Sequence, residues 1–141
     1  MSTKGWYGAV SLGEGLFRKQ GSTVKNWKIR KYALFSSFEL TYSDTISNAT
    51  KGTMNVSNVS IREGTRENTK LSSSPHKDAY AMDILSYEDS RTLEVVFDSM
   101  EEAKKFLRVL CKCSKKHNIS VSKNYFLLLL LYCIKILLYT V

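Results

Sequence analysis

The 141-residue sequence is poor in the side chains that build metal centres and disulfide scaffolds. It contains two histidines and three cysteines, and the cysteines (Cys111, Cys113 and Cys133) form no Cys-x-x-Cys pair. These counts argue against a zinc site, and the odd number of cysteines argues against a disulfide framework. We therefore expect no metal, and reduced thiols in a cytoplasmic protein.

The sequence also lacks the residue sets that accompany common catalytic machinery. It shows no Ser-His-Asp set, no Cys-His pair and no glycine-rich phosphate loop. Gly13-x-Gly15 precedes a predicted strand rather than a helix, so it is not a nucleotide-binding fingerprint. His76 adjoins the only proline, Pro75, in a polar stretch, where we expect it to be exposed. We predict a protein that is not an enzyme and needs no cofactor.

Acidic residues are scarce relative to basic ones. The chain has 13 Asp and Glu against 21 Lys and Arg, which gives a formal net charge of +8 at pH 7. A surplus of this size favours anionic partners such as nucleic acid, inositol phosphates or an acidic membrane surface. Hydrophobic residues make up 43% of the chain, an ordinary globular fraction, so we expect one folded domain rather than disorder.

Short strands are predicted for most of the chain before residue 98. Residues 38–42 alternate strictly between apolar and polar, which places Phe38, Leu40 and Tyr42 on one face. Residues 62–77 hold Gly64, Pro75 and many charges, and we predict a loop there. The predicted strands are residues 15–19, 27–35, 38–42, 53–56, 59–61, 79–85 and 92–97.

A helix is predicted from Ser99 onward. Ser99-Met100-Glu101-Glu102 is a capping box, in which the Ser99 hydroxyl accepts a hydrogen bond from the Glu102 amide. Apolar residues then recur at helical spacing: Ala103, Phe106, Leu107, Leu110 and Cys111. Because one amphipathic helix follows about seven strands, we predict an antiparallel barrel or sandwich with one open side covered by the helix.

The end of the chain is almost wholly apolar. Residues 125–141 would span about 26 Å as a helix, at the lower limit for crossing a bilayer. Lys135 is close enough to the end to extend towards the membrane surface. Three interpretations stay open: a tail anchor, a segment that packs on the domain or a partner, and a gene-model error. We divide the chain into an N-terminal extension (1–13), a domain (14–118) and a hydrophobic tail (119–141).

The order of the predicted elements resembles a pleckstrin-homology (PH) domain over about residues 14–116. Glu14-Gly15-Leu16-Phe17-Arg18-Lys19-Gln20-Gly21 is similar to the family's first strand, and Trp27-Lys28-Ile29-Arg30-Lys31-Tyr32-Ala33-Leu34 to its second. Residues 40–42, 51–56 and 91–97 resemble its third, fourth and last strands. The family's helix usually carries a tryptophan where this chain has Phe106. The resemblance implies a mostly β fold, a seven-stranded antiparallel barrel or sandwich capped by one C-terminal amphipathic α-helix.

The resemblance also implies a phosphoinositide site on the first two strands. The family's signature is a basic residue on the first strand and basic-x-Arg on the second, matched here by Lys19 and Lys28-x-Arg30. Side chains two apart on a strand share a face, so Lys28 and Arg30 project together. A hairpin would bring them close to Lys19 at one mouth. By resemblance, Tyr42 adds a hydroxyl contact to a ring phosphate, although a packing role for Tyr42 stays open.

Three further cations, Arg18, Lys25 and Lys31, lie near the same turn in sequence. We expect them to contribute general attraction to an acidic membrane leaflet. The resulting hypothesis is a monomeric, non-enzymatic module that binds a phosphoinositide or inositol phosphate head group and positions the protein at a cytoplasmic membrane surface. The alternative is a protein-interaction scaffold of the same fold. Nucleic acid is a less favoured partner, since the strand pattern places many aromatic side chains in a core.

Overall fold

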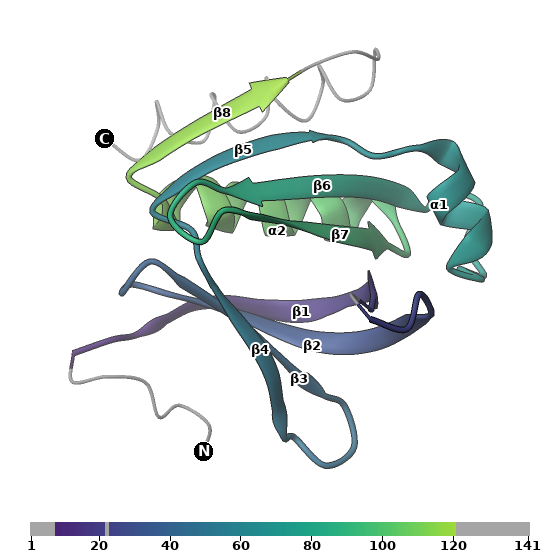
Figure 1. Ribbon diagram of the computed structural model, residues 1–141, viewed down its shortest axis with the longest axis horizontal. Coiled ribbons are helices and arrows are strands. Elements are labelled where there is room, and N and C mark those ends of the chain that lie inside the picture. Colours follow the sequence, from purple (N-terminus) through teal and green to yellow (C-terminus); the bar gives the residue numbers. More distant parts are fainter. Residues whose placement is uncertain (1–7, 22, 121–141) are drawn as a thin grey trace.

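The computed structural model describes residues 8–21 and 23–120, which form eight strands and two helices (Figure 1). In chain order the elements are β1 (Ser11–Gln20), β2 (Trp27–Phe35), β3 (Glu39–Asp44), β4 (Thr50–Asn55), β5 (Asn58–Glu63), α1 (Arg66–Leu71), β6 (Tyr80–Ser86), β7 (Arg91–Phe97), α2 (Met100–Cys113) and β8 (Lys116–Ser120).

The strands form one continuous hydrogen-bonded sheet in the order β4-β3-β2-β1-β7-β6-β5-β8. Figure 1 shows this sheet folded into two layers, with β1 to β4 in one and β5 to β8 in the other. The layers join where β1 pairs with β7, through Arg18 opposite Val96 and Lys19 opposite Val95. The end of β1 is therefore fixed at the seam between the two layers, and this fixes the position of Lys19.

The core between the layers is built around four aromatic rings. Phe17 of β1 stacks on Tyr32 of β2 at 5.2 Å between ring centroids. Phe106 of α2 lies 5.0 Å from Tyr32 and 5.0 Å from Phe97 of β7. All four side chains are buried, so the helix and both layers share one core. Burial of a large apolar side chain contributes about 1.5–3 kcal/mol, which makes this cluster a principal source of stability.

The predicted helix and its cap are confirmed. The Ser99 hydroxyl accepts a hydrogen bond of 3.2 Å from the Glu102 amide, and α2 begins at the next residue, Met100. Its buried side is the predicted apolar set with Cys113 added: Ala103, Phe106, Leu107, Leu110, Cys111 and Cys113. The predicted fold class is confirmed as well, a mostly β sheet closed by a C-terminal helix, although the described residues form eight strands instead of seven.

One local prediction is wrong, and one strand was not predicted. Residues 62–77 are not one loop, because β5 continues to Glu63 and a short helix, α1, follows Thr65, whose hydroxyl caps it. A six-residue helix that buries none of its side chains leaves no hydrophobic period to detect. The last strand, β8, was not predicted. It pairs parallel with β5 at the sheet edge, and only its Ile119 packs against the core.

The described elements extend slightly beyond the limits expected for the domain. β1 begins at Ser11, ahead of the expected start at residue 14, and β8 ends at Ser120, beyond the expected end at residue 118. The apolar segment 125–141, interpreted above as a candidate anchor, lies outside the described residues. Within residues 8–21 and 23–120, no helix is long and apolar enough to cross a membrane.

Candidate functional site

A cavity of about 390 Å³ opens beside the β1–β2 and β3–β4 hairpins. It is lined by the four predicted site residues, Lys19, Lys28, Arg30 and Tyr42. The structure therefore brings together the three cations that the strand pattern placed at one mouth and the tyrosine that the family resemblance added. The other residues on its wall are Gly21, Thr23, Val24, Asn26, Lys51, Gly52 and Arg91.

Strand register explains why the first three cations converge. Lys19 and Lys28 are direct cross-strand partners in the β1–β2 pair, and Arg30 lies two residues further along β2. Successive side chains on a strand alternate between faces, so all three lie on the inner face. Further along that face are the buried rings of Phe17 and Tyr32. The cations thus stand at the open end of a row whose other end is the hydrophobic core.

Lys19 is the most enclosed lysine of the cavity. Its Nζ donates to the carbonyl oxygen of Gln20 at 3.0 Å and lies 5.1 Å from the centre of the Tyr42 ring. Burial, followed by the nearby charges of Arg91 and Arg30, lowers the pKa of Lys19 from its ordinary value. The positive charges of this cluster repel one another, and a bound anion would relieve that repulsion.

Arg30 is held by the β3–β4 turn. Its Nη1 lies 3.4 Å from Oδ1 of Asp44, at the end of β3. The other carboxylate oxygen of Asp44 accepts hydrogen bonds from the backbone amides of Ile46 and Ser47, at 3.1 and 2.8 Å. These amides, together with the Ser47 hydroxyl and the charge of Arg30, lower the pKa of Asp44. Asp44 therefore both stabilises the β3–β4 turn and orients Arg30.

The structure adds two cations that the sequence analysis did not assign to the site, Arg91 and Lys51. Arg91, the first residue of β7, donates from Nη2 to the Tyr42 hydroxyl at 2.9 Å. Lys51 of β4 lines the cavity next to Gly52. Both residues lie in segments that resemble strands of the family, 51–56 and 91–97. We used these segments only to infer the fold and did not assign either residue to the site. Together the described residues that line the cavity include five cations and no carboxylate.

Tyr42 belongs to both the core and the cavity. Its side chain is 5% exposed, and its ring lies 6.4 Å from that of Phe17. The ring crosses the backbone of β4 at Gly52, where a Cβ atom would collide with the Tyr42 hydroxyl. Because that hydroxyl accepts its hydrogen bond from Arg91, its own proton is available to a ligand.

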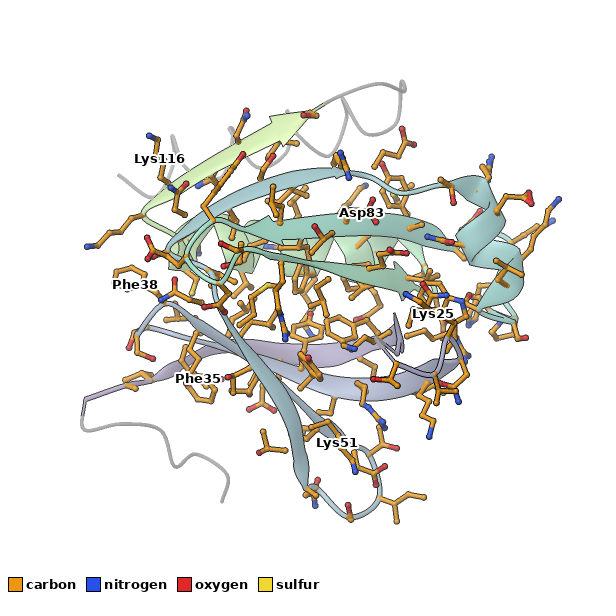
Figure 2. All side chains as sticks on the ribbon, in the orientation of Figure 1. Lys25, Phe35, Phe38, Lys51, Asp83 and Lys116 are labelled. Carbon is orange, nitrogen blue, oxygen red and sulfur yellow. The ribbon has the colours of Figure 1, made fainter. Side chains whose placement is uncertain are left out.

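The three cations expected to act through general attraction lie outside the cavity wall. Arg18 alternates to the outer face of β1, where its Nε lies 3.1 Å from Asp98. Lys31 lies on the outer face of β2, 3.9 Å from Glu14. Lys25 is exposed on the loop between β1 and β2. Figure 2 shows Lys25 beside this loop and Lys51 on the β3–β4 hairpin, with Lys116 on a distant part of the surface.

The comparisons with known proteins identify the family. The sequence model of the PH domain matches residues 11–115. The chain belongs to the PH domain family. PH domains are generally non-catalytic modules, and this one has the family's fold. The search of curated proteins found no match to this sequence.

Solved structures give the same fold at low sequence identity. The C-terminal PH domain of human pleckstrin is 18% identical, with a TM-score of 0.60 over 80% of this chain and 94% of that chain. The same pleckstrin domain in complex with D-myo-Ins(1,2,3,5,6)P5 is 19% identical, with a TM-score of 0.59 over 74% and 95%. An activated truncation of Vav1 is 12% identical, with a TM-score of 0.56 over 73% and 26%.

Proposed function

We propose that this PH domain binds the head group of a phosphoinositide in the cavity of Lys19, Lys28, Arg30, Lys51 and Arg91. The observation that carries the proposal is the convergence of five cations and no carboxylate among the described residues of one cavity wall. The structure of the pleckstrin PH domain with an inositol pentakisphosphate supports a ligand of this class.

The chemistry of the wall fits a compact, multiply charged ligand. Arg30 and Arg91 can each grip one phosphate with two parallel hydrogen bonds, whereas the lysines act as point charges. A charged hydrogen bond contributes about 1.5–3 kcal/mol. Three or four of them are sufficient for a dissociation constant in the micromolar range after the costs of binding. The hydroxyl of Tyr42 provides one further donor.

Two exposed apolar side chains on the loops of the β1–β2 and β3–β4 hairpins favour a head group that is still attached to a membrane. Val24, on the β1–β2 loop and on the cavity wall, is 66% exposed, and Ile46, on the β3–β4 turn, is 90% exposed. The backbone amide of Ile46 donates to Asp44, which pairs with Arg30, so this contact connects Ile46 to a cation of the site. Apolar side chains that enter the interfacial region of a bilayer gain burial while the cations meet the anionic surface. We infer recruitment to a cytoplasmic membrane surface.

The proposal is tested with the double variant Lys28→Ala/Arg30→Ala. The unaltered chain should bind a soluble inositol tetrakisphosphate in calorimetry, and the variant should lose at least tenfold in affinity with an unchanged far-UV spectrum. Lys112→Ala/Lys116→Ala is the matched control, because it removes the same charge from exposed positions on α2 and β8. If the unaltered chain ignores both inositol phosphates and phosphoinositide vesicles at low salt, the lipid function is refuted and the protein-scaffold alternative stands.

A second variant separates membrane-bound from free head groups. Val24→Ser/Ile46→Ser should keep its affinity for the soluble inositol phosphate and lose about tenfold or more in binding to phosphoinositide vesicles. The control is Val10→Ser/Leu12→Ser, which alters two exposed apolar residues at the opposite end of β1. Equal vesicle binding by the two double variants would contradict a role for Val24 and Ile46 at the membrane.

A further inference from the structure

The loop between β1 and β2 holds a threonine at the mouth of the cavity. Thr23 lines the cavity and is exposed to solvent. The loop is closed by two backbone hydrogen bonds, from Gly21 to Asn26 at 2.9 Å and from Asn26 to Val24 at 2.8 Å. It is also tight, since a Cβ atom at Gly21 would collide with the carbonyl oxygen of Val24. This geometry keeps Thr23 beside the cations.

The sequence around Thr23 is basic on both sides. Arg18 and Lys19 precede it by five and four residues, and Lys25 and Lys28 follow it by two and five. An exposed hydroxyl on a loop, flanked by cations, suits protein kinases whose substrate grooves are acidic, because kinases select substrates in part by charge pattern. The Thr23 hydroxyl is therefore accessible to a protein kinase and is a group that a kinase can phosphorylate.

We propose that Thr23 is a phosphorylation site and that its phosphate closes the cavity against the head group. In the step, the hydroxyl oxygen Oγ1 of Thr23 forms a bond to the terminal phosphorus of ATP. The bond from that phosphorus to the bridging oxygen breaks, ADP leaves and the hydroxyl proton passes to the kinase base. The consequence for ligand binding rests on the proposed function, whereas the contact between phosphate and cations does not.

The electrostatics of the cavity favour this intramolecular anion. A phosphothreonine carries about −1.5 to −2 charges at neutral pH and three acceptor oxygens. The described residues of the wall include five cations and no carboxylate, although one of these cations, Arg30, pairs with Asp44 outside the wall. A tethered group acts at an effective concentration of about millimolar. A phosphate at Thr23 thus neutralises part of the site and competes with a ligand present at micromolar levels.

The first test measures the contact alone. Phosphothreonine is incorporated at position 23 of the full chain, and its second ionisation is followed by ³¹P NMR. We expect this pKa to fall about one unit below the value of about 6 usual for phosphothreonine, and to return towards it in the Lys28→Ala/Arg30→Ala background. Phosphoserine at Ser37, on the exposed β2–β3 turn at the other end of β2, is the control. A phosphate at position 23 that titrates like the control overturns the proposal, whatever the domain binds.

The second test measures access and competition. The Ser22→Ala chain is incubated with ATP and a panel of serine/threonine kinases selective for basic flanks, and the modified residue is located by mass spectrometry. We expect incorporation at Thr23 that Thr23→Ala abolishes. The phosphorylated chain should bind the soluble inositol tetrakisphosphate at least tenfold more weakly than the same chain before phosphorylation. Absence of label at Thr23, or unchanged affinity of the phosphorylated chain, overturns the proposal.

Discussion

The guanidinium of Arg91 donates a hydrogen bond of 2.9 Å to the hydroxyl oxygen of Tyr42, and so joins the start of β7 to the middle of β3 across the cavity. These residues are 49 positions apart in the chain. Their contact links the two layers of the sheet at the site. The Tyr42 hydroxyl can still donate its proton to a ligand, because it acts only as an acceptor in the hydrogen bond from Arg91.

Replacing Tyr42 by Phe should weaken head-group binding about three- to tenfold. The ring keeps its place against Phe17, but Arg91 loses its acceptor and the ligand loses a donor. Stability should fall by about 1 kcal/mol or less, the net worth of one hydrogen bond. Calorimetry with a soluble inositol phosphate and urea unfolding measure the two effects. Unchanged affinity would mean that the hydroxyl serves only the fold.

Gly52→Ala should damage both stability and the site. The added Cβ collides with the Tyr42 hydroxyl, so either Tyr42 or the β4 backbone must move. Forced shifts in a packed interior typically cost about 1–3 kcal/mol. Urea unfolding measures the loss, and Thr53→Ala, at the exposed next position, is the control. A Gly52→Ala protein as stable as this control would contradict the close packing of Tyr42 on β4.

Head-group affinity should fall in alkaline solution earlier than ordinary lysines allow. The pKa of Lys19 is lowered by burial and by Arg91 and Arg30, so Lys19 loses its charge at a lower pH than a solvated lysine. Since the anion binds the charged form, affinity declines as the pH rises through this lowered pKa. Lys19→Arg should keep its affinity further into the alkaline range, because arginine stays charged. Superimposable affinity profiles from pH 7 to 10 would contradict this role of Lys19.

Phe106→Trp should destabilise the domain, although tryptophan is common at this position in the family. Phe106 is fully buried, with the rings of Tyr32 and Phe97 both 5.0 Å away. A larger indole overfills this space, at a typical cost of about 1–3 kcal/mol. Phe106→Ala, which leaves a cavity, should cost about 3–5 kcal/mol. Urea unfolding ranks the two, and a tryptophan variant more stable than the natural chain would refute the prediction.

The resemblance to the PH family's signature located three site residues in the sequence, and the two-residue period of a strand explains their spacing. Lys28 and Arg30 share a face because they are two apart, and Lys19 joins them because a hairpin pairs neighbouring strands. The helix was equally readable, since Ser99 caps it and its apolar residues recur at helical spacing. Such local patterns are physical properties of the chain itself.

Helix α1 and strand β8 could not be predicted in this way. Neither element contains a buried side chain, so the sequence shows no apolar period for either of them. Strand β8 exists because the edge of β5 offers it backbone partners, and that edge is a product of the folded sheet.

The sequence by itself therefore determined a mostly β domain of the PH family, its final helix and the inward row of Lys19, Lys28 and Arg30. Only the tertiary structure decided that Lys51 and Arg91 complete the cavity and that Tyr42 lies between core and site. The reason is that these relationships depend on how the two layers meet at the β1–β7 seam, a contact between distant parts of the chain that no local period records.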